Sequence, residues 1–494
     1  MTEENIRLIF GLKLRELRQN NQMSLSDLSQ ASGISVSYLN EIEKGKKYPK
    51  GSKISALAVA LDADYDYLVS LQLGKNLAPI SELLRSNLLH DLPLGMFGIG
   101  VPDLLEMLSN APTRVSAFIN TLFEITRSYN MSVEQFYFSS LRSYQELHNN
   151  YFPKLENSVA EFRKSFLTTE SISTELLISI LNKQYNYQVF TSGLEKEPKL
   201  KHLRSVCLPG KQPRLILNKN LNTRQQKFAL ARELAYNHLA LNERSYTTSW
   251  VEVNSFEQVL NNFKASYFSC ALLMPAEEMK IDIQYWLSLP KWNENHLTNL
   301  LIKYDVSPET LLYRFTNLLP YFFDINELFF LRFNQPVNGD EYFLTKELHL
   351  SGHHNPHTSM LDEHYCRRWV SLTIFDELAE TNSAKVICRA QRSQYIGSEN
   401  EYLVIALAKA GSPEPGRNSS LSIGLKINQR IKEKVNWWQD EALPLRKVNQ
   451  TCEQCPAVDC QERAAPPIHL KAVNRLEETK WALKNLGQKF KSED

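Results

Sequence analysis

The first 70 residues alternate apolar and polar positions with the spacing of short helices. Leu39 and Ile42 are three residues apart, and Leu57 and Leu61 are four apart. Side chains at these spacings lie on one face of an α-helix, so each pair marks a face that needs a partner. The pattern predicts five short helices packed into one compact head over residues 6–70.

A helical spacer and a mixed domain are predicted next. Residues 73–165 keep the helical spacing, but helix-breaking residues interrupt it at Pro93, Gly95, Gly98 and Gly100. These interruptions indicate a spacer. Over residues 166–285, helical segments flank a short apolar run, Arg214 to Leu217, which predicts a strand. An amphipathic pattern from about Thr223 to Leu241 predicts a long helix after it.

The last part of the chain, residues 286–494, has the pattern of a further folded domain. Strands are predicted at Leu328–Phe333, Ala384–Arg389 and Tyr402–Leu407, and a charged helix at the C-terminal end. The predicted fold class is a multidomain chain, mainly α with α+β. It comprises a five-helix head (residues 1–72), the helical spacer, an α+β middle domain and an α+β C-terminal domain that we expect to be sensory.

Residues 24–45 carry the signals that begin and end two short helices across a tight turn. Ser24 and Asp27 have the spacing of a capping box, in which the serine and the acid satisfy each other's backbone amides. The turn, a second N-cap and a left-handed C-terminal residue are predicted at Ser32–Gly33, Ser35 and Gly45. The result is a helix-turn-helix.

The second of these helices has an outer face that suits DNA. With Leu39 and Ile42 turned inward, the outward positions near its start are Val36, Ser37, Asn40, Glu41 and Lys44. In a major groove Asn pairs with adenine, Glu accepts from cytosine, and Val contacts the thymine methyl group. We expect a double-stranded DNA operator as partner, with the capping serines Ser24 and Ser35 and the basic side chains of Arg18, Lys46 and Lys47 completing the surface.

Composition narrows this picture without changing it. At about 150 residues per domain, 494 residues predict about three domains. The net charge is only +1, so DNA binding must rest on a local basic patch. No apolar run approaches the roughly 20 residues that span a bilayer, and seven cysteines are too few for a secreted disulfide framework. We therefore expect a cytoplasmic protein that does not bind membranes.

The stretch "MSLSDLSQASGISVSYLNEIEKGKKYP" closely resembles the lambda-repressor-like, or XRE-type, helix-turn-helix family of bacterial and phage regulators. The resemblance covers about residues 5–70. It implies binding as a homodimer, or a higher homo-oligomer, to paired half-sites, with the dimer contacts further along the chain.

The middle domain resembles the ImmA/IrrE-like zinc metallopeptidase family through "LILNKNLNTRQQKFALARELAYNHLAL" and "FKASYFSCALLMP". The resemblance implies a zincin-like α+β fold with a His-Glu-x-x-His helix and a later acidic ligand. Only Glu233, the general base, matches, because the ligand positions hold Arg232, Tyr236 and Lys264. Cationic side chains repel a zinc ion, so we expect no peptidase activity. Either Arg232, Glu233 and Lys264 form an ion pair, or Arg232 and Lys264 bind an anionic effector.

Potential metal ligands gather in the C-terminal domain. Cys452 and Cys455 have the spacing that lets two thiolates bind one zinc ion, and Cys460 follows. Cys366 or a nearby histidine could supply the fourth ligand if the two segments meet; the histidines are His349, His353, His354, His357 and His364. Zinc, an iron-sulfur cluster, and free thiols or a disulfide all remain open, as do structural roles for the histidines.

Several C-terminal stretches resemble the short-chain fatty acyl-coenzyme A regulators, which share this domain order: "LLYRFTNLLPYFF", "LFFLRF", "KELHLSGHHNPH", "EHYCRRW" and "CEQCPAVDCQERAAPP". The resemblance implies an acyl-coenzyme A effector and control of acetate- or propionate-type carboxylate metabolism. Arg367 and Arg368 could bind the effector's phosphates and Trp369 could wall its acyl chain. Alternatively, these residues form a surface charge pair beside a core tryptophan.

A ligand-responsive transcription factor is therefore the function that the sequence predicts. Two alternatives remain at this stage. One is a phage or toxin-antitoxin repressor whose extra domains mediate protein contacts, and the other is a peptidase that cleaves a repressor.

Overall fold

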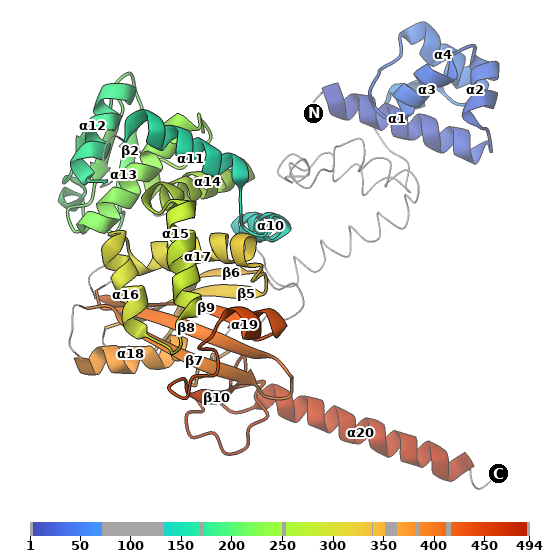
Figure 1. The fold of residues 1–494 in the computed structure, drawn as a ribbon. Helices are drawn as coiled ribbons and strands as arrows, with labels where there is room; N and C mark the ends of the chain where they lie inside the picture. Colours follow the sequence, from blue (N-terminus) through green and yellow to red (C-terminus); the bar gives the residue numbers. More distant parts are fainter. Residues whose placement is uncertain are drawn as a thin grey trace. The chain divides into compact units, whose positions relative to one another are not determined.

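The computed structural model describes residues 3–71, 133–167, 172–248, 253–337, 339–350, 363–381, 385–411 and 416–491 (Figure 1). The chain forms two compact units, one of residues 1–144 with 254–256 and one of residues 145–253 with 257–494. The helix-breaking residues of the predicted spacer lie outside the described residues. The predicted domain boundaries remain predictions.

The head consists of the predicted helices: α1 (Glu3–Asn20), α2 (Leu25–Ser32), α3 (Val36–Glu43), α4 (Gly51–Ala60) and α5 (Tyr65–Val69). The apolar pairs that predicted them meet in one core, where Leu39, Ile42 and Leu57 are fully buried. Burying a leucine or isoleucine side chain contributes about 1.5–3 kcal/mol, so these few side chains hold the head together.

Gly11 lets α1 and α3 pack closely. A Cβ atom at position 11 would lie 2.3 Å from the carbonyl oxygen of Ile42, closer than side-chain carbons come to backbone oxygens. Only glycine therefore fits where these two helices cross. No pattern in the sequence marks this position.

The middle of the second unit is an α+β arrangement around a small sheet of strand order β1-β3-β2-β4. The strands are β1 (Gln188–Phe190), β2 (Ser205–Leu208), β3 (Arg214–Leu217) and β4 (Thr247–Thr248). β1 is parallel to β3, and β2 is antiparallel to both β3 and β4. The accompanying helices are α11 (Pro153–Phe166), α12 (Thr174–Tyr185), α13 (Thr223–His238), α14 (Phe256–Leu273) and α15 (Ala276–Ser288). Most of α10 (Val133–Leu147) belongs to the first unit.

The rest of the unit is built on a six-stranded sheet of order β10-β7-β8-β9-β5-β6 (Figure 1). The strands are β5 (Leu328–Pro336), β6 (Phe343–His349), β7 (Ile387–Tyr395), β8 (Glu401–Lys409), β9 (Arg417–Lys426) and β10 (Leu445–Val448). All neighbours are antiparallel except β10 and β7. The helices are α16 (Glu294–Lys303), α17 (Pro308–Phe323), α18 (Val370–Thr381), α19 (Gln429–Lys434) and α20 (Ile468–Lys491).

Both faces of this sheet are covered. Phe330 and the other residues on its face of β5 pack into the core that includes α17, whereas Phe329 and Leu331 pack into the core that includes α18. Successive residues of a strand point to opposite faces, so a strand that is covered on both sides has apolar residues at consecutive positions. This accounts for the nearly continuous apolar stretch "LFFLRF" in β5. Gly424 makes room for Phe329, since a Cβ atom there would lie 2.1 Å from its ring.

The predicted elements differ from the structure mainly in length. Strand β3 and the start of α13 are where the sequence predicts them, but α13 ends at His238, because Ala240 adopts a left-handed conformation with φ of 51°. Strand β7 runs to Tyr395 because it pairs with β8 as far as Gln394. The predicted start at Ala384 lies outside the described residues.

Candidate DNA-binding surface and ligand sites

The helix-turn-helix has the predicted caps. The Asp27 amide donates to Ser24 Oγ at 3.1 Å, and the Ser24 amide donates to Asp27 Oδ2 at 2.8 Å. Gly33 has a φ of 69°, and Ser35 Oγ accepts from the Tyr38 amide at 3.4 Å. These hydrogen bonds from Ser24 lower the pKa of Asp27, which keeps its carboxylate charged at the positive end of α2.

The predicted reading face lies on the outside of α3. Val36, Ser37 and Asn40 are exposed, Glu41 and Lys44 are half-buried, and Leu39 and Ile42 are fully buried. Lys46, Lys47, Ser24 and Ser35 are exposed as well. A row of polar side chains is therefore held by a rigid apolar core on its other side. Their contacts with DNA remain predictions.

Arg18, which we expected to contact a phosphate, is engaged within the head, and its contact with DNA remains a prediction. Its Nε and Nη2 atoms donate to the two carboxylate oxygens of Glu43 at 2.6 and 2.8 Å, and Nη1 donates to the Met23 carbonyl at 2.8 Å. The Arg18 and Glu43 side chains are only 12% and 5% exposed. The guanidinium group therefore joins α1 to the end of α3, and its surroundings favour a structural role.

Two of the residues in the peptidase-like ligand positions, Arg232 and Tyr236, donate to neutral groups, and the third, Lys264, contacts an asparagine and a glutamate. Arg232 on α13 donates to Asn262 Oδ1 at 3.2 Å and to the Thr248 hydroxyl, and Tyr236 donates to the same Asn262 oxygen at 3.2 Å. Lys264 donates to Asn261 at 3.3 Å and lies 3.8 Å from the Glu257 carboxylate. Arg232 and Lys264 thus contact different asparagines of α14, and an effector between them remains a prediction.

Glu233 forms an ion pair, but with a partner that the sequence did not indicate. Nη1 and Nη2 of Arg244 donate to its two oxygens, both at 2.7 Å, and the Tyr187 hydroxyl donates at 2.7 Å. The expected pairing with Arg232 and Lys264 is therefore wrong. Burial alone would raise the pKa of Glu233, but the hydrogen bonds and charge of Arg244 outweigh it and hold this pKa below its usual value.

The two cysteine-bearing segments meet as the metal hypothesis requires. Tyr365 pairs with Thr451, and the Cys452 amide donates to the His364 carbonyl at 2.8 Å. Cys366, Cys452, Cys455 and Cys460 form no disulfides, and burial raises the pKa of Cys366 to about 11. Within the described ranges, no three His, Cys, Asp or Glu side chains are arranged to hold a metal ion. His364 instead contacts Glu453 at 2.7 Å, and His353, His354 and His357 lie outside the described residues.

The predicted effector residues before α18 point to separate partners. Arg367 lies over the Tyr342 ring at 4.3 Å, and Arg368 Nε donates to Glu462 at 3.0 Å. Trp369 is buried, and its indole N–H donates to the Asn449 carbonyl at 3.0 Å. The three side chains do not form one cluster, but Trp369 lines a cavity.

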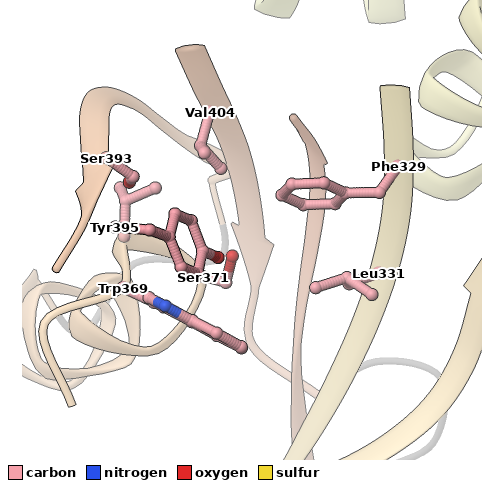
Figure 2. Close-up of a pocket in the computed structure, with 8 residues that line it drawn as sticks. Phe329, Leu331, Trp369, Ser371, Ser393, Tyr395 and Val404 are labelled. Atoms are coloured by element: carbon pink, nitrogen blue, oxygen red, sulfur yellow. The ribbon is translucent and has the colours of Figure 1, made fainter. Parts of the chain in front are cut away.

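This small cavity lies between α18 and the six-stranded sheet (Figure 2). Its walls are the apolar side chains of Phe329, Leu331, Trp369, Val370, Tyr395 and Val404, together with two serines, Ser371 and Ser393. Apart from Trp369, no pattern in the sequence predicted these residues as a group. They come from four separate elements that only the fold brings together.

Comparison with known proteins agrees with the head and the middle domain. Residues 14–68 match a helix-turn-helix family model, and residues 182–316 match the IrrE N-terminal-like domain. The chain is 31% identical over 81 residues to the transcriptional regulator ClgR of Mycobacterium tuberculosis, covering 16% of this chain and 71% of that protein. It is 38% identical over 61 residues to the HTH-type transcriptional repressor RghR of Bacillus subtilis, covering 12% of this chain and 45% of that protein.

These similarities, on a head with capped helices and an exposed polar face, define the class of protein. The chain belongs to the XRE-type family of helix-turn-helix transcriptional regulators, and it is a DNA-binding regulator with an IrrE-like domain. A solved M. tuberculosis transcriptional regulator is also similar, with a TM-score of 0.46 and 16% identity over 67% of this chain and 94% of that one. None of the helices described here is long and apolar enough to cross a membrane.

Proposed function

We propose that this regulator responds to a short-chain acyl-coenzyme A and controls genes of carboxylate metabolism. The observation that carries the proposal is the small cavity beside Trp369, whose walls are mostly apolar. Apolar walls of this kind suit the end of a short acyl chain, which would have to widen the cavity on entering it. The Ser393 hydroxyl accepts from Gln391 and keeps its own proton to donate to a thioester carbonyl. The proposal also rests on the resemblance to the acyl-coenzyme A regulators.

Calorimetric titration with acetyl-, propionyl- and butyryl-coenzyme A, and with free coenzyme A, tests this proposal. We expect an acyl thioester to bind more tightly than free coenzyme A and to change operator affinity. Val404→Phe fills the cavity and should weaken the acyl preference, whereas Val337→Phe makes the same change at a position that is 53% exposed. Equal binding of all four compounds, or unchanged binding by Val404→Phe, would contradict the proposal.

We propose that operator bases are read by the exposed residues of α3. Asn40→Ala removes a side chain that can pair with adenine, and such a contact is worth about 1–3 kcal/mol. Asn20→Ala, at the exposed C-terminal end of α1, is the matched control. We expect Asn40→Ala alone to weaken binding and relax specificity at one base position in a mobility-shift assay. Equal losses in both variants would contradict this assignment.

We propose that the peptidase-like domain does not cleave peptides. The positions that bind zinc in the family hold Arg232, Tyr236 and Lys264, and Glu233 is engaged by Arg244. An Arg stays protonated at any physiological pH, so it cannot replace a zinc-binding histidine. Metal analysis of the purified protein and peptidase assays with and without added zinc test this. Activity that is lost in Glu233→Gln would contradict it.

Zinc at Cys366, Cys452, Cys455 and Cys460 remains a prediction. The backbone pairing of Tyr365 with Thr451 supports it, whereas the side-chain arrangement in the described residues does not form a ligand set. Metal analysis of wild type and of Cys452→Ser decides between bound zinc and free thiols.

We propose that the chain acts as a homodimer through α20. The exposed apolar side chains of Leu476 and Leu483 are seven residues apart, and Leu486 follows three residues later. This spacing places all three on one helix face, which suits pairing with a second copy as a coiled coil. Light scattering should give a dimer for wild type and a monomer for Leu476→Glu with Leu483→Glu. A dimer of the double variant would contradict the proposal.

A further inference from the structure

A second cavity lies inside the larger unit, between the peptidase-like part and the six-stranded sheet. Its lining residues come from both sides. Arg204 and Gln225 belong to the peptidase-like part, and Ser307, Pro308 and Glu309 form the start of α17. The sheet contributes Arg332, Lys409, Ser419 and Leu421.

One carboxylate in this cavity is surrounded by several basic groups. Glu309 lies 3.2 Å from Arg332 and 3.2 Å from Lys346, and its side chain is 26% exposed. Burial would raise the pKa of Glu309, but the charges of Arg332, Lys346 and Arg204 lower it to about 2. Glu309 is therefore ionised at physiological pH. Among the described residues that line the cavity it is the only carboxylate, whereas Arg204, Arg332 and Lys409 are basic.

Lys409 adds a further positive charge to the same cavity. No carboxylate among the described residues lies within ion-pair distance of it. Burial, and then the charge of Arg224, lower the pKa of Lys409. Arg224 itself is paired with Asp305 at 2.8 Å. An anion beside Lys409 would offset both the burial and the repulsion.

The cavity also offers the polar groups that a tetrahedral anion needs. The N-terminal end of α17, a helix of 16 residues, lines it through Ser307 and Pro308, and helix N-termini favour negative charge. The planar guanidinium group of Arg332 can donate two parallel hydrogen bonds to phosphate, and the Lys409 ammonium acts as a point charge. Ser419 adds a hydroxyl.

We propose that this cavity binds the phosphate group of a small metabolite. The bound phosphate would contact both Arg204 of the peptidase-like part and Lys409 of the sheet, and so would hold the two parts together. The site does not depend on the acyl-coenzyme A proposal. Leu331 lines the cavity beside Trp369 and Arg332 lines this one, and adjacent strand residues point to opposite faces of the sheet.

Calorimetry of the full-length protein with inorganic phosphate tests this site, with succinate as a second probe. Lys409→Met should weaken phosphate binding by about tenfold or more, the loss expected when a contact worth about 1.4 kcal/mol is removed. Lys434→Met removes the same charge from an exposed residue of α19 and should leave binding unchanged. The same titrations in Val404→Phe should also be unchanged, since that residue lines the other cavity.

Three results would overturn the proposal. The first is no phosphate binding by wild type, the second is equal binding by wild type and Lys409→Met, and the third is tighter binding of succinate than of phosphate. Circular dichroism and thermal melting of Lys409→Met show whether that variant folds. If Lys409→Met does not fold, Ser419→Leu provides a second test. It narrows the cavity without removing a charge, so it should abolish phosphate binding by excluding the ion. Phosphate binding that is retained in Ser419→Leu would overturn the proposed site.

Discussion

Two glutamates of the larger unit, Glu233 and Glu309, are both held ionised by basic side chains, yet their surroundings differ. Glu233 is 3% exposed and faces one arginine, whose two nitrogens match its two oxygens. Glu309 faces Arg332, Lys346 and Arg204, and it borders a cavity. A buried carboxylate whose two oxygens are both paired with one cation has its charge balanced and leaves no room for a ligand. Where several cations surround one carboxylate beside a cavity, the excess positive charge can attract an anionic ligand.

The matched pair should be the more important for stability. Arg244→Met leaves the Glu233 carboxylate buried without its partner, and breaking a buried ion pair in this way costs about 3–5 kcal/mol. Chemical denaturation of the full chain, followed by far-UV circular dichroism, measures the loss. Adding Glu233→Gln to Arg244→Met should recover at least half of it, because no charge is then left buried. A cost below about 1 kcal/mol for the single variant would contradict the comparison.

The unmatched site should respond to loss of its carboxylate in two opposite ways. Glu309→Gln removes charge-assisted hydrogen bonds to Arg332 and Lys346, which should cost about 1.5–3 kcal/mol. The same change makes the cavity more positive, so phosphate should bind more tightly than it binds wild type. Denaturation with and without phosphate measures both effects. Weaker phosphate binding in Glu309→Gln would show that this glutamate belongs to the ligand's own site.

The dependence of stability on acidic pH should distinguish the stabilisation by the Glu309 carboxylate from that of the other groups in the chain. The pKa of Glu309 is about 2 in the folded chain and would rise to about 4.3 on unfolding. Its stabilisation is therefore complete above the unfolded value and is lost as the pH falls toward 2. Urea denaturation between pH 5 and pH 3 should show a shallower decline for Glu309→Gln than for wild type. Parallel curves would argue against the ionised role of Glu309.

The smallest effect is expected at Lys409. The lowered pKa of Lys409 means that its charged form is disfavoured in the folded chain. Stability should therefore rise with pH between the folded pKa of Lys409 and its unfolded pKa of about 10.4. Lys409→Met should remove this alkaline rise and leave the chain as stable as wild type or slightly more stable. Phosphate should suppress the rise in wild type, since an anion restores the lysine's charge. Thermal melting from pH 7 to pH 10 measures both.

Local signals were predictable from the sequence, whereas pairings between distant residues were not. Ser24, Ser35 and Gly33 act through neighbours only a few residues away, so their spacing alone specifies the caps and the turn. Arg244 lies 11 residues after Glu233, in a segment without periodicity, and nothing in its spacing indicates the pair. Arg18 looked like a phosphate contact because its partner Glu43 is 25 residues away.

The two cavities were beyond prediction for the same reason. Trp369 was identified because an aromatic residue beside two arginines is conspicuous, but its neighbours Phe329 and Val404 reach it only through the sheet order. Arg204 and Lys409 are about 200 positions apart and meet only because two parts of the unit pack together. Periodicity predicts which face of an element is buried, and it says nothing of what lies opposite.

Gly11 has a consequence for how mutations in this regulator would appear in a genetic screen. An added methyl group would lie 2.3 Å from the Ile42 carbonyl oxygen, so α3 would have to shift relative to α1. Any such shift would move Asn40 and its neighbours, the residues that we propose to read the operator. Alleles at Gly11 should therefore behave like operator-contact mutants, with loss of promoter control at normal protein levels, although position 11 itself carries no side chain to touch DNA.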